Sequence, residues 1–175
     1  MKNLVLGIAV LCFTLTSKVD DSHHVHGRGQ ARIKITGDKV AIKLKLPVHN
    51  IIGFERQPKS KAQRQELVKA EAMLLQVDNV VKLAPISECE LASKKLTVKR
   101  FKKKKNHEHA DFMLSYKFRC LRPSELNEIQ FVVFDRFVKL QNIDVLLSYG
   151  AKGGTKSAKT EELTRQRDTL QIVKS

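Results

Sequence analysis

The most regular feature of the sequence is an alternation of hydrophobic and polar residues along two neighbouring segments. Residues 31–35 read A-R-I-K-I, and residues 40–46 read V-A-I-K-L-K-L after a short turn at 36–39. Because side chains alternate along a strand, this period of two places one side in the core and the other in solvent. The two segments therefore predict a β-hairpin.

Further strands are predicted in the second half of the chain. The alternation returns at residues 109–120, where the hydrophobic side runs from Phe112 to Cys120, and again at residues 143–149. The continuous hydrophobic run 129–134 is typical of a buried strand. Two shorter strands are predicted at residues 80–83 and 170–173, and a hairpin edge at residues 89–91 and 96–98.

Helical signals are concentrated in one segment. Ser60, followed three residues later by Gln63, forms a capping-box pattern, and hydrophobic residues recur at helical spacing over 67–75. Several strands with one long helix predict an α+β fold, with a mainly antiparallel β-sheet in a single domain. The remaining segments are predicted to form two loops and a short helix, at residues 47–55, 150–159 and 160–163.

The N-terminus carries the pattern of a signal peptide. A basic start is followed by a hydrophobic run of a length typical of secretion signals and too short for a membrane span. Residues 1–17 are therefore predicted to be removed, leaving residues 18–175 as a single exported domain. Lipidation at Cys12 is the competing interpretation, but Leu11 stands where lipoproteins usually carry a small residue.

Cys89 and Cys120 are the two cysteines left after cleavage. In an exported chain they most simply form one disulfide. Two buried free thiols are the alternative, and a metal site is less consistent because neither cysteine lies in a C-x-x-C pair.

The chain is strongly basic, with a formal net charge of +15. Basic proteins often bind nucleic acid, but no nucleic-acid-binding motif is present, tryptophan is absent and aromatic residues are few. Export also removes most contact with nucleic acid. We interpret the charge mainly as a solubility property and as a source of attraction to anionic membrane surfaces.

Two histidine windows are the main candidates for chemistry. Residues 23–26 read H-H-V-H, and residues 107–111 read H-E-H-A-D. Imidazole and carboxylate groups are zinc ligands, and zinc is preferred over calcium where imidazole dominates. On a strand, residues two apart point the same way, so each window can offer a pair of ligands on its solvent-facing side. The predicted metal ligands are His24, His26, His107, His109 and Asp111.

Several features qualify this site. Two ligand pairs would form one four-ligand site only if their strands were neighbours. Asp111 could instead orient a ligand imidazole, and the histidines could be exposed without binding a metal. Lys102 to Lys105 adjoin the second window, which weakens cation binding while keeping nearby imidazoles neutral. His23 and Glu108 point the wrong way on an ideal strand, and His49 is interpreted as a loop histidine.

Enzymatic motifs are absent from the sequence. There is no G-x-S-x-G, H-E-x-x-H or P-loop pattern. No general base stands out beside the histidines. The chain is therefore expected not to be an enzyme.

Six short motifs occur along the chain in this order: 23–27 (HHVHG), 50–55 (NIIGFE), 89–91 (CEL), 109–112 (HADF), 116–120 (YKFRC) and 134–137 (FDRF). Together they resemble the ZrgA-like family of zinc-regulated periplasmic zinc-binding proteins of Gram-negative bacteria. The resemblance runs from about residue 23 to residue 172. The family commonly has a long His/Asp/Glu-rich insertion before the H-A-D-F segment, where this chain has only Lys102 to Glu108.

The resemblance implies a periplasmic protein associated with zinc acquisition alongside an ABC-type zinc importer. It implies that His24, His26, His109 and Asp111 occupy the family's histidine-containing segments. The leading hypothesis is an accessory protein that captures or buffers zinc. The alternatives are an envelope structural or interaction module with incidental histidines and, on charge alone, a cytoplasmic nucleic-acid binder.

Overall fold

A six-stranded sheet forms the centre of the molecule. The computed structural model describes residues 27–54, 57–100, 110–151 and 154–173. The strands follow the order β4-β5-β2-β1-β7-β8, and every neighbouring pair is antiparallel except β1 and β7. Their bounds are Arg28–Thr36 (β1), Lys39–Pro47 (β2), Cys89–Arg100 (β4), Ala110–Cys120 (β5), Asn142–Ala151 (β7) and Gly154–Thr164 (β8).

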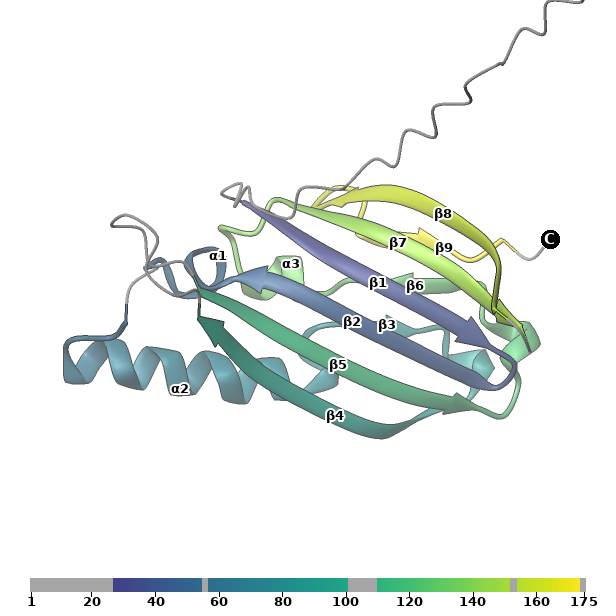
Figure 1. Cartoon of the computed structure of the whole chain (residues 1–175), viewed down its shortest axis with the longest axis horizontal. Coiled ribbons are helices and arrows are strands. Elements are labelled where there is room, and N and C mark those ends of the chain that lie inside the picture. The colour runs from purple at the N-terminus through teal and green to yellow at the C-terminus, as the bar shows by residue number, and fades with distance from the viewer. Residues whose placement is uncertain (1–26, 55–56, 101–109, 152–153, 174–175) are drawn as a thin grey trace, which may run out of the picture.

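A smaller antiparallel sheet of order β3-β6-β9 forms a second layer. Figure 1 shows β3, β6 and α3 behind the large sheet, with α2 at the lower left. The predicted α+β class, with a mainly antiparallel sheet and one long helix, is confirmed. The bounds are Lys82–Leu83 (β3), Glu128–Gln130 (β6), Thr169–Gln171 (β9), Val48–Ile52 (α1), Lys61–Leu75 (α2) and Val133–Arg136 (α3), with short 3-10 turns at Val77–Asn79, Pro85–Ser87 and Pro123–Glu125.

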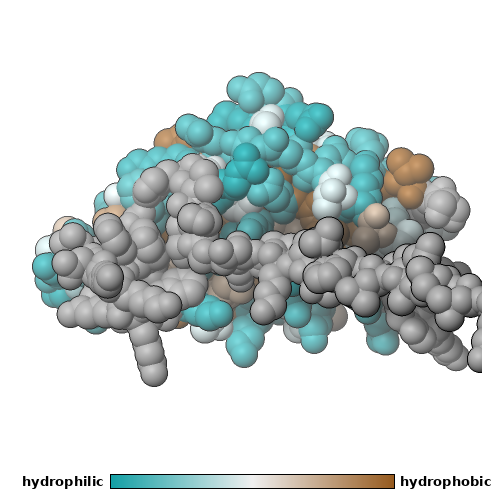
Figure 2. Space-filling view, turned by 45° about the horizontal axis from the view of Figure 1, so that its top comes forward, coloured by the Kyte–Doolittle hydropathy of each residue, from teal (hydrophilic) through white to brown (hydrophobic). Residues whose placement is uncertain are grey.

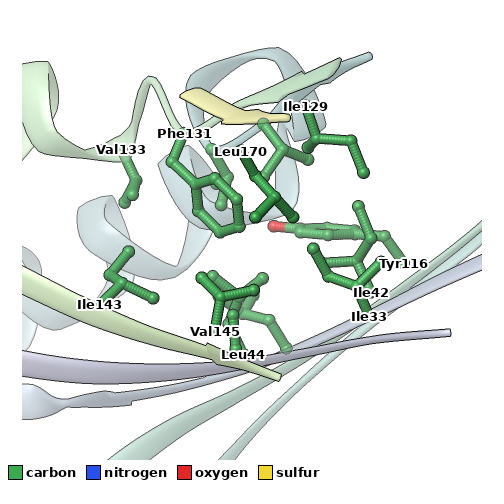
Figure 3. Close-up of a cluster of buried hydrophobic side chains, with 14 of the residues drawn as sticks. Ile33, Ile42, Leu44, Tyr116, Ile129, Phe131, Val133, Ile143, Val145 and Leu170 are labelled. Atoms are coloured by element: carbon green, nitrogen blue, oxygen red, sulfur yellow. The ribbon is translucent and has the colours of Figure 1, made fainter. Parts of the chain in front are cut away.

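The hydrophobic core lies between the two sheets. Figure 3 shows side chains of the large sheet facing those that come from β6, β9 and the segment after β6. Burial of this apolar surface is the main stabilising term, at roughly 25 cal/mol per Å². Fully or almost fully buried members include Ile33, Ile42, Leu44, Tyr116, Ile129, Phe131, Val145 and Leu170.

The predicted hairpin and helix start are both confirmed. β1 and β2 pair from Gln30–Lys45 to Thr36–Lys39, and Gly37 between them has a φ of 57°, which glycine adopts at low cost. At the start of α2, the Gln63 N–H donates to Ser60 Oγ at 3.1 Å, and the Ser60 N–H donates to Gln63 Oε1 at 3.3 Å. This reciprocal pair is the predicted capping box.

The structure differs from the predicted elements in three segments. Residues 129–134 are buried as predicted, but they divide into β6 and the start of α3, because a continuous hydrophobic run has no period that separates strand from helix. The predicted loop 150–159 and helix 160–163 contain the edge strand β8, whose exposed polar residues form a strand by pairing with β7. The predicted loop 47–55 contains α1, a single short turn of helix.

The strand β4 also differs from its prediction. Residues 89–91 and 96–98 belong to one continuous strand with an irregularity between Leu91 and Ser93, and not to a hairpin. A β-bulge leaves one residue unpaired and interrupts the alternation that marks a strand in the sequence. Lys99 and Arg100 complete β4, and residues 101–109, which include Lys102 to Lys105, lie outside the described residues.

Tyr116 joins the long helix to the large sheet. Its side chain is fully buried, and its O–H donates to the carbonyl oxygen of Leu74 in the last turn of α2. Burial raises the pKa of Tyr116, so the phenol stays protonated and remains a donor. Because the folded pKa lies above the unfolded value of about 10, this contribution to stability is present below pH 10 and lost as the pH rises further.

Replacing Tyr116 by Phe is expected to lower the free energy of unfolding by about 1–2 kcal/mol, because the Leu74 carbonyl loses its donor inside the core. Urea unfolding measures the change. Tyr149→Phe is the matched control: it removes an exposed hydrogen bond of 2.9 Å to the Val173 carbonyl and is expected to cost less. Equal losses in both variants would contradict a role for Tyr116 in fastening α2.

Candidate functional site

The site is built at the end of the large sheet where β1 and β5 begin. β2 pairs antiparallel with both strands, so β1 and β5 run in the same direction and start at the same end. Asp111 in β5 is opposite Pro47 in β2, and Arg28 lies two residues beyond the Gln30–Lys45 pair. The starts of β1 and β5, which adjoin the two histidine windows in the sequence, therefore lie at the same end of the large sheet.

The strands that follow the two windows are not neighbours. β2 lies between β1 and β5, so the condition that the two strands be neighbours is not met. Two interstrand spacings separate β1 from β5, about 9.5 Å in total. Imidazoles that approach one zinc ion from opposite sides, each with a Zn–N distance near ~2.1 Å, can bridge a separation of this order.

Asn50 anchors the backbone at the start of β1, directly after the first histidine window (residues 23–26). Its side chain is almost fully buried: Oδ1 accepts from the Gly27 N–H at 2.9 Å, and Nδ2 donates to the Arg28 carbonyl at 3.1 Å. Gly27 has a φ of 81°, a left-handed conformation that side chains rarely adopt. Its carbonyl accepts from the backbone N–H of Gln141 at 2.7 Å. These three hydrogen bonds and the left-handed conformation of Gly27 set the direction of the chain just after His26.

Arg28 adds an electrostatic clamp beside this junction. Its guanidinium contacts Asp144 at 2.6 Å and Glu162 at 2.8 Å, and Asn142 donates to the same Glu162 oxygen at 2.7 Å. The hydrogen bond to Asp144 is the main reason that the pKa of Arg28 is raised. The clamp ties the start of β1 to β7 and β8.

Asp111 lies at the matching position on β5. The alternation predicted a solvent-facing side chain, but Asp111 is fully buried. Its Oδ2 lies 3.9 Å from Nζ of Lys45, whose side chain is also largely covered. The period of two gives the direction in which a side chain points and carries no information about what covers it. The carboxylate is therefore held in place close to a cation.

The other predicted ligands, His24, His26, His107 and His109, lie outside the described residues, as does the predicted signal segment 1–17. Across the part of the chain that the structure describes, no group of three or more His, Cys, Asp and Glu side chains could hold a metal ion. His49 lies in α1, not in the predicted loop, and its carbonyl accepts from the Gly53 N–H.

The two cysteines form the predicted disulfide. Cys89 begins β4, Cys120 ends β5, and the two residues are direct partners across these strands. The bridge lies at the end of β5 opposite Asp111, roughly 30 Å away for nine residues of extended strand. It fixes the β4–β5 hairpin at a distance from the histidine windows.

A groove of about 700 Å³ lies beside the disulfide. Four acidic residues line it, and one of them, Glu88, forms an ion pair with Arg122. The sequence carries no motif that marks this groove, because its residues come from five separate segments. They include Asp78, Val81, Leu83, Glu88, Glu90, Phe118, Leu121 and Glu128.

A comparison with models of protein families shows to which family this chain belongs. The model of the family described as "ZrgA family zinc uptake protein" matches residues 23–172. The chain belongs to the ZrgA family. The match spans both histidine windows, Asn50, the disulfide and all nine strands of the two sheets, and the family's description associates the chain with zinc uptake.

Two further results describe this ZrgA family member. No curated protein matches the chain. Among the described residues, no helix is long and hydrophobic enough to cross a membrane.

Asn50 is the residue of this site to which the sequence pattern assigned no role. It stands in one of the family-like motifs, 50–55. The signal in the sequence that could have pointed to Asn50 is its position between the hydrophobic residues Val48 and Ile51. The structure shows that Asn50 is buried there, and a buried polar side chain needs hydrogen-bond partners.

Proposed function

We propose that this protein is an exported, zinc-binding accessory protein that captures or buffers zinc in the periplasm for uptake, without catalysing a reaction. One observation carries the proposal beyond family membership: β1 and β5 start at the same end of the sheet, so the windows containing His24, His26, His107 and His109 adjoin one edge. Zinc is the cargo, and an ABC-type zinc importer is the proposed recipient.

Asp111 has one of two roles in this proposal. It is two residues from His109, and its burial beside Lys45 limits its motion. A carboxylate already close to a cation is well suited to accept the N–H of a ligand imidazole, which fixes the tautomer that binds zinc. Direct ligation by Asp111 is the other role.

The test is a zinc titration by calorimetry on protein that is expressed from its full sequence and purified with its disulfide intact. We expect a dissociation constant of micromolar or tighter, which corresponds to about −8 kcal/mol or better. The His24→Ala, His109→Ala double variant should bind more weakly by on the order of 100-fold, since even the hydrogen-bond partners of ligands contribute 10–100-fold. Its zinc-dependent rise in melting temperature should disappear.

His49→Gln is the matched control, because His49 lies at the same end of the sheet but outside both windows; its zinc response should equal that of the wild type. An unchanged response in the double variant would exclude these ligands even if zinc binds elsewhere. No response in the wild type would favour the alternative function, an envelope interaction module with incidental histidines.

A further inference from the structure

We propose that the open side of the large sheet is a docking surface for anionic membrane lipids. The basic face, as we name it, consists of five exposed residues on four adjacent strands: Arg32 and Lys34 of β1, Lys43 of β2, Lys95 of β4 and Lys117 of β5. On all four strands the opposite side chains pack toward the second layer, as Ile33, Ile42, Tyr116 and the half-buried Leu96 do. The inference is independent of zinc binding.

The strand register places these cations in two successive rows. One row runs Arg32–Lys43–Ser115–Lys95, and the next runs Lys34–Ala41–Lys117–Ser93. Strands lie about 4.8 Å apart, and side chains of the same face are about 6.8 Å apart along a strand. The cations therefore form a two-dimensional array about 15 Å wide, and the positions between them are small residues.

The array keeps like charges together at a cost in stability. Arg32 and Lys43 are direct cross-strand partners, an arrangement that is unfavourable for two cations. Neither row contains an acidic residue. Within the described residues, none of the five cations forms an ion pair. A mixture of Lys and Glu would give the same solubility with better pairing, so the segregation favours an anionic partner.

Acidic residues lie outside the two rows: Asp144 and Glu162 stand in the next row toward the start of β1. Asp144 and Glu162 are held by Arg28 at one end of the sheet, and four acidic residues line the groove at the disulfide end. Helix α2 carries both signs of charge along its length. The two rows therefore carry a local excess of positive charge.

The shape of the array favours a membrane over other anionic partners. It is broad and contains no aromatic residue for stacking on bases. It has no large hydrophobic residue within the two rows, so binding would be peripheral and electrostatic, without insertion. In the orientation of Figure 2, hydrophilic side chains likewise make up most of the coloured surface. Export, which the pattern at residues 1–17 predicts, would bring the protein near lipid headgroups.

Vesicle sedimentation in metal-free buffer tests the proposal. Full-sequence protein is mixed with vesicles of 70% phosphatidylcholine and 30% phosphatidylglycerol, and with vesicles of phosphatidylcholine alone. We expect binding to the anionic vesicles only, with a loss of tenfold or more when salt is raised from 50 to 500 mM. Lys43→Glu, Lys117→Glu should weaken binding by roughly tenfold or more, since each cation near an anionic surface contributes about fivefold.

The matched control is Lys61→Glu, Lys69→Glu on α2, which makes the same change in net charge at two exposed lysines away from the basic face. Its binding should stay within about threefold of the wild type, and thermal melts confirm that both variants fold. Both variants also keep Lys102 to Lys105. Equal losses in the two variants, or no vesicle binding at all, would overturn the proposal. Binding to polyglutamate but not to vesicles would identify an acidic polypeptide as the partner instead.

Discussion

Replacing Cys89 and Cys120 together by serine is expected to lower the free energy of unfolding by about 3–4 kcal/mol, the largest effect that we predict. The two residues are 31 positions apart, and a bridge that closes a loop of this length restricts the unfolded chain to this extent in the chain-entropy model. They also fasten the first residue of β4, an edge strand of the sheet, to the last residue of β5. Without the bridge, this end of β4 is held by strand pairing and by the packing of its side chains.

Urea unfolding under non-reducing conditions measures the loss. The wild type in excess dithiothreitol is the control, and it should unfold at the same midpoint as the double-serine variant. Because the bridge lies at the opposite end of β5 from Asp111, the folded variant should keep the zinc response of the wild type. A variant as stable as the oxidised wild type would contradict a structural role for the disulfide.

Replacing Asn50 by Ala is expected to lower the free energy of unfolding by about 2–4 kcal/mol and to weaken zinc binding. The change leaves the Gly27 N–H and the Arg28 carbonyl without the partners they have in the folded chain. A buried polar group that loses its partner costs about 1–3 kcal/mol. Zinc binding should weaken because the chain immediately after His26 is no longer held in one direction.

Urea unfolding and zinc calorimetry at 25 °C separate these two effects. Asn79→Ala is the matched control: its amide donates to the Met73 carbonyl at 3.3 Å and to the Gln76 side chain at 2.9 Å, and it is only partly buried. It should cost less than Asn50→Ala and leave zinc affinity unchanged. Asn50→Asp, which keeps the acceptor for the Gly27 N–H, should be intermediate in stability if the two hydrogen bonds act separately. An Asn50→Ala variant no less stable than Asn79→Ala would exclude the anchoring role.

The sequence alone determined the elements whose signals are local. The alternation in β1, β2, β5 and β7 predicted strands because a half-buried strand needs a period of two. The capping box predicted the start of α2 because Ser60 and Gln63 satisfy backbone groups within one turn. The family-like motifs pointed to zinc, and the family match agrees with that association.

Only the tertiary structure decided the features that depend on distant partners. β8 is a strand because β7 supplies its hydrogen bonds, although its own residues are polar. Asp111 is buried although the alternation places it on the outer side, and Asn50 anchors Gly27 from 23 residues away. The order of strands, with β2 between β1 and β5, brings the two windows to one end without making their strands neighbours. The sequence pattern of a strand shows to which side of the sheet each side chain points. Whether that side chain is buried, and which groups it contacts, depends on segments that are distant in the sequence.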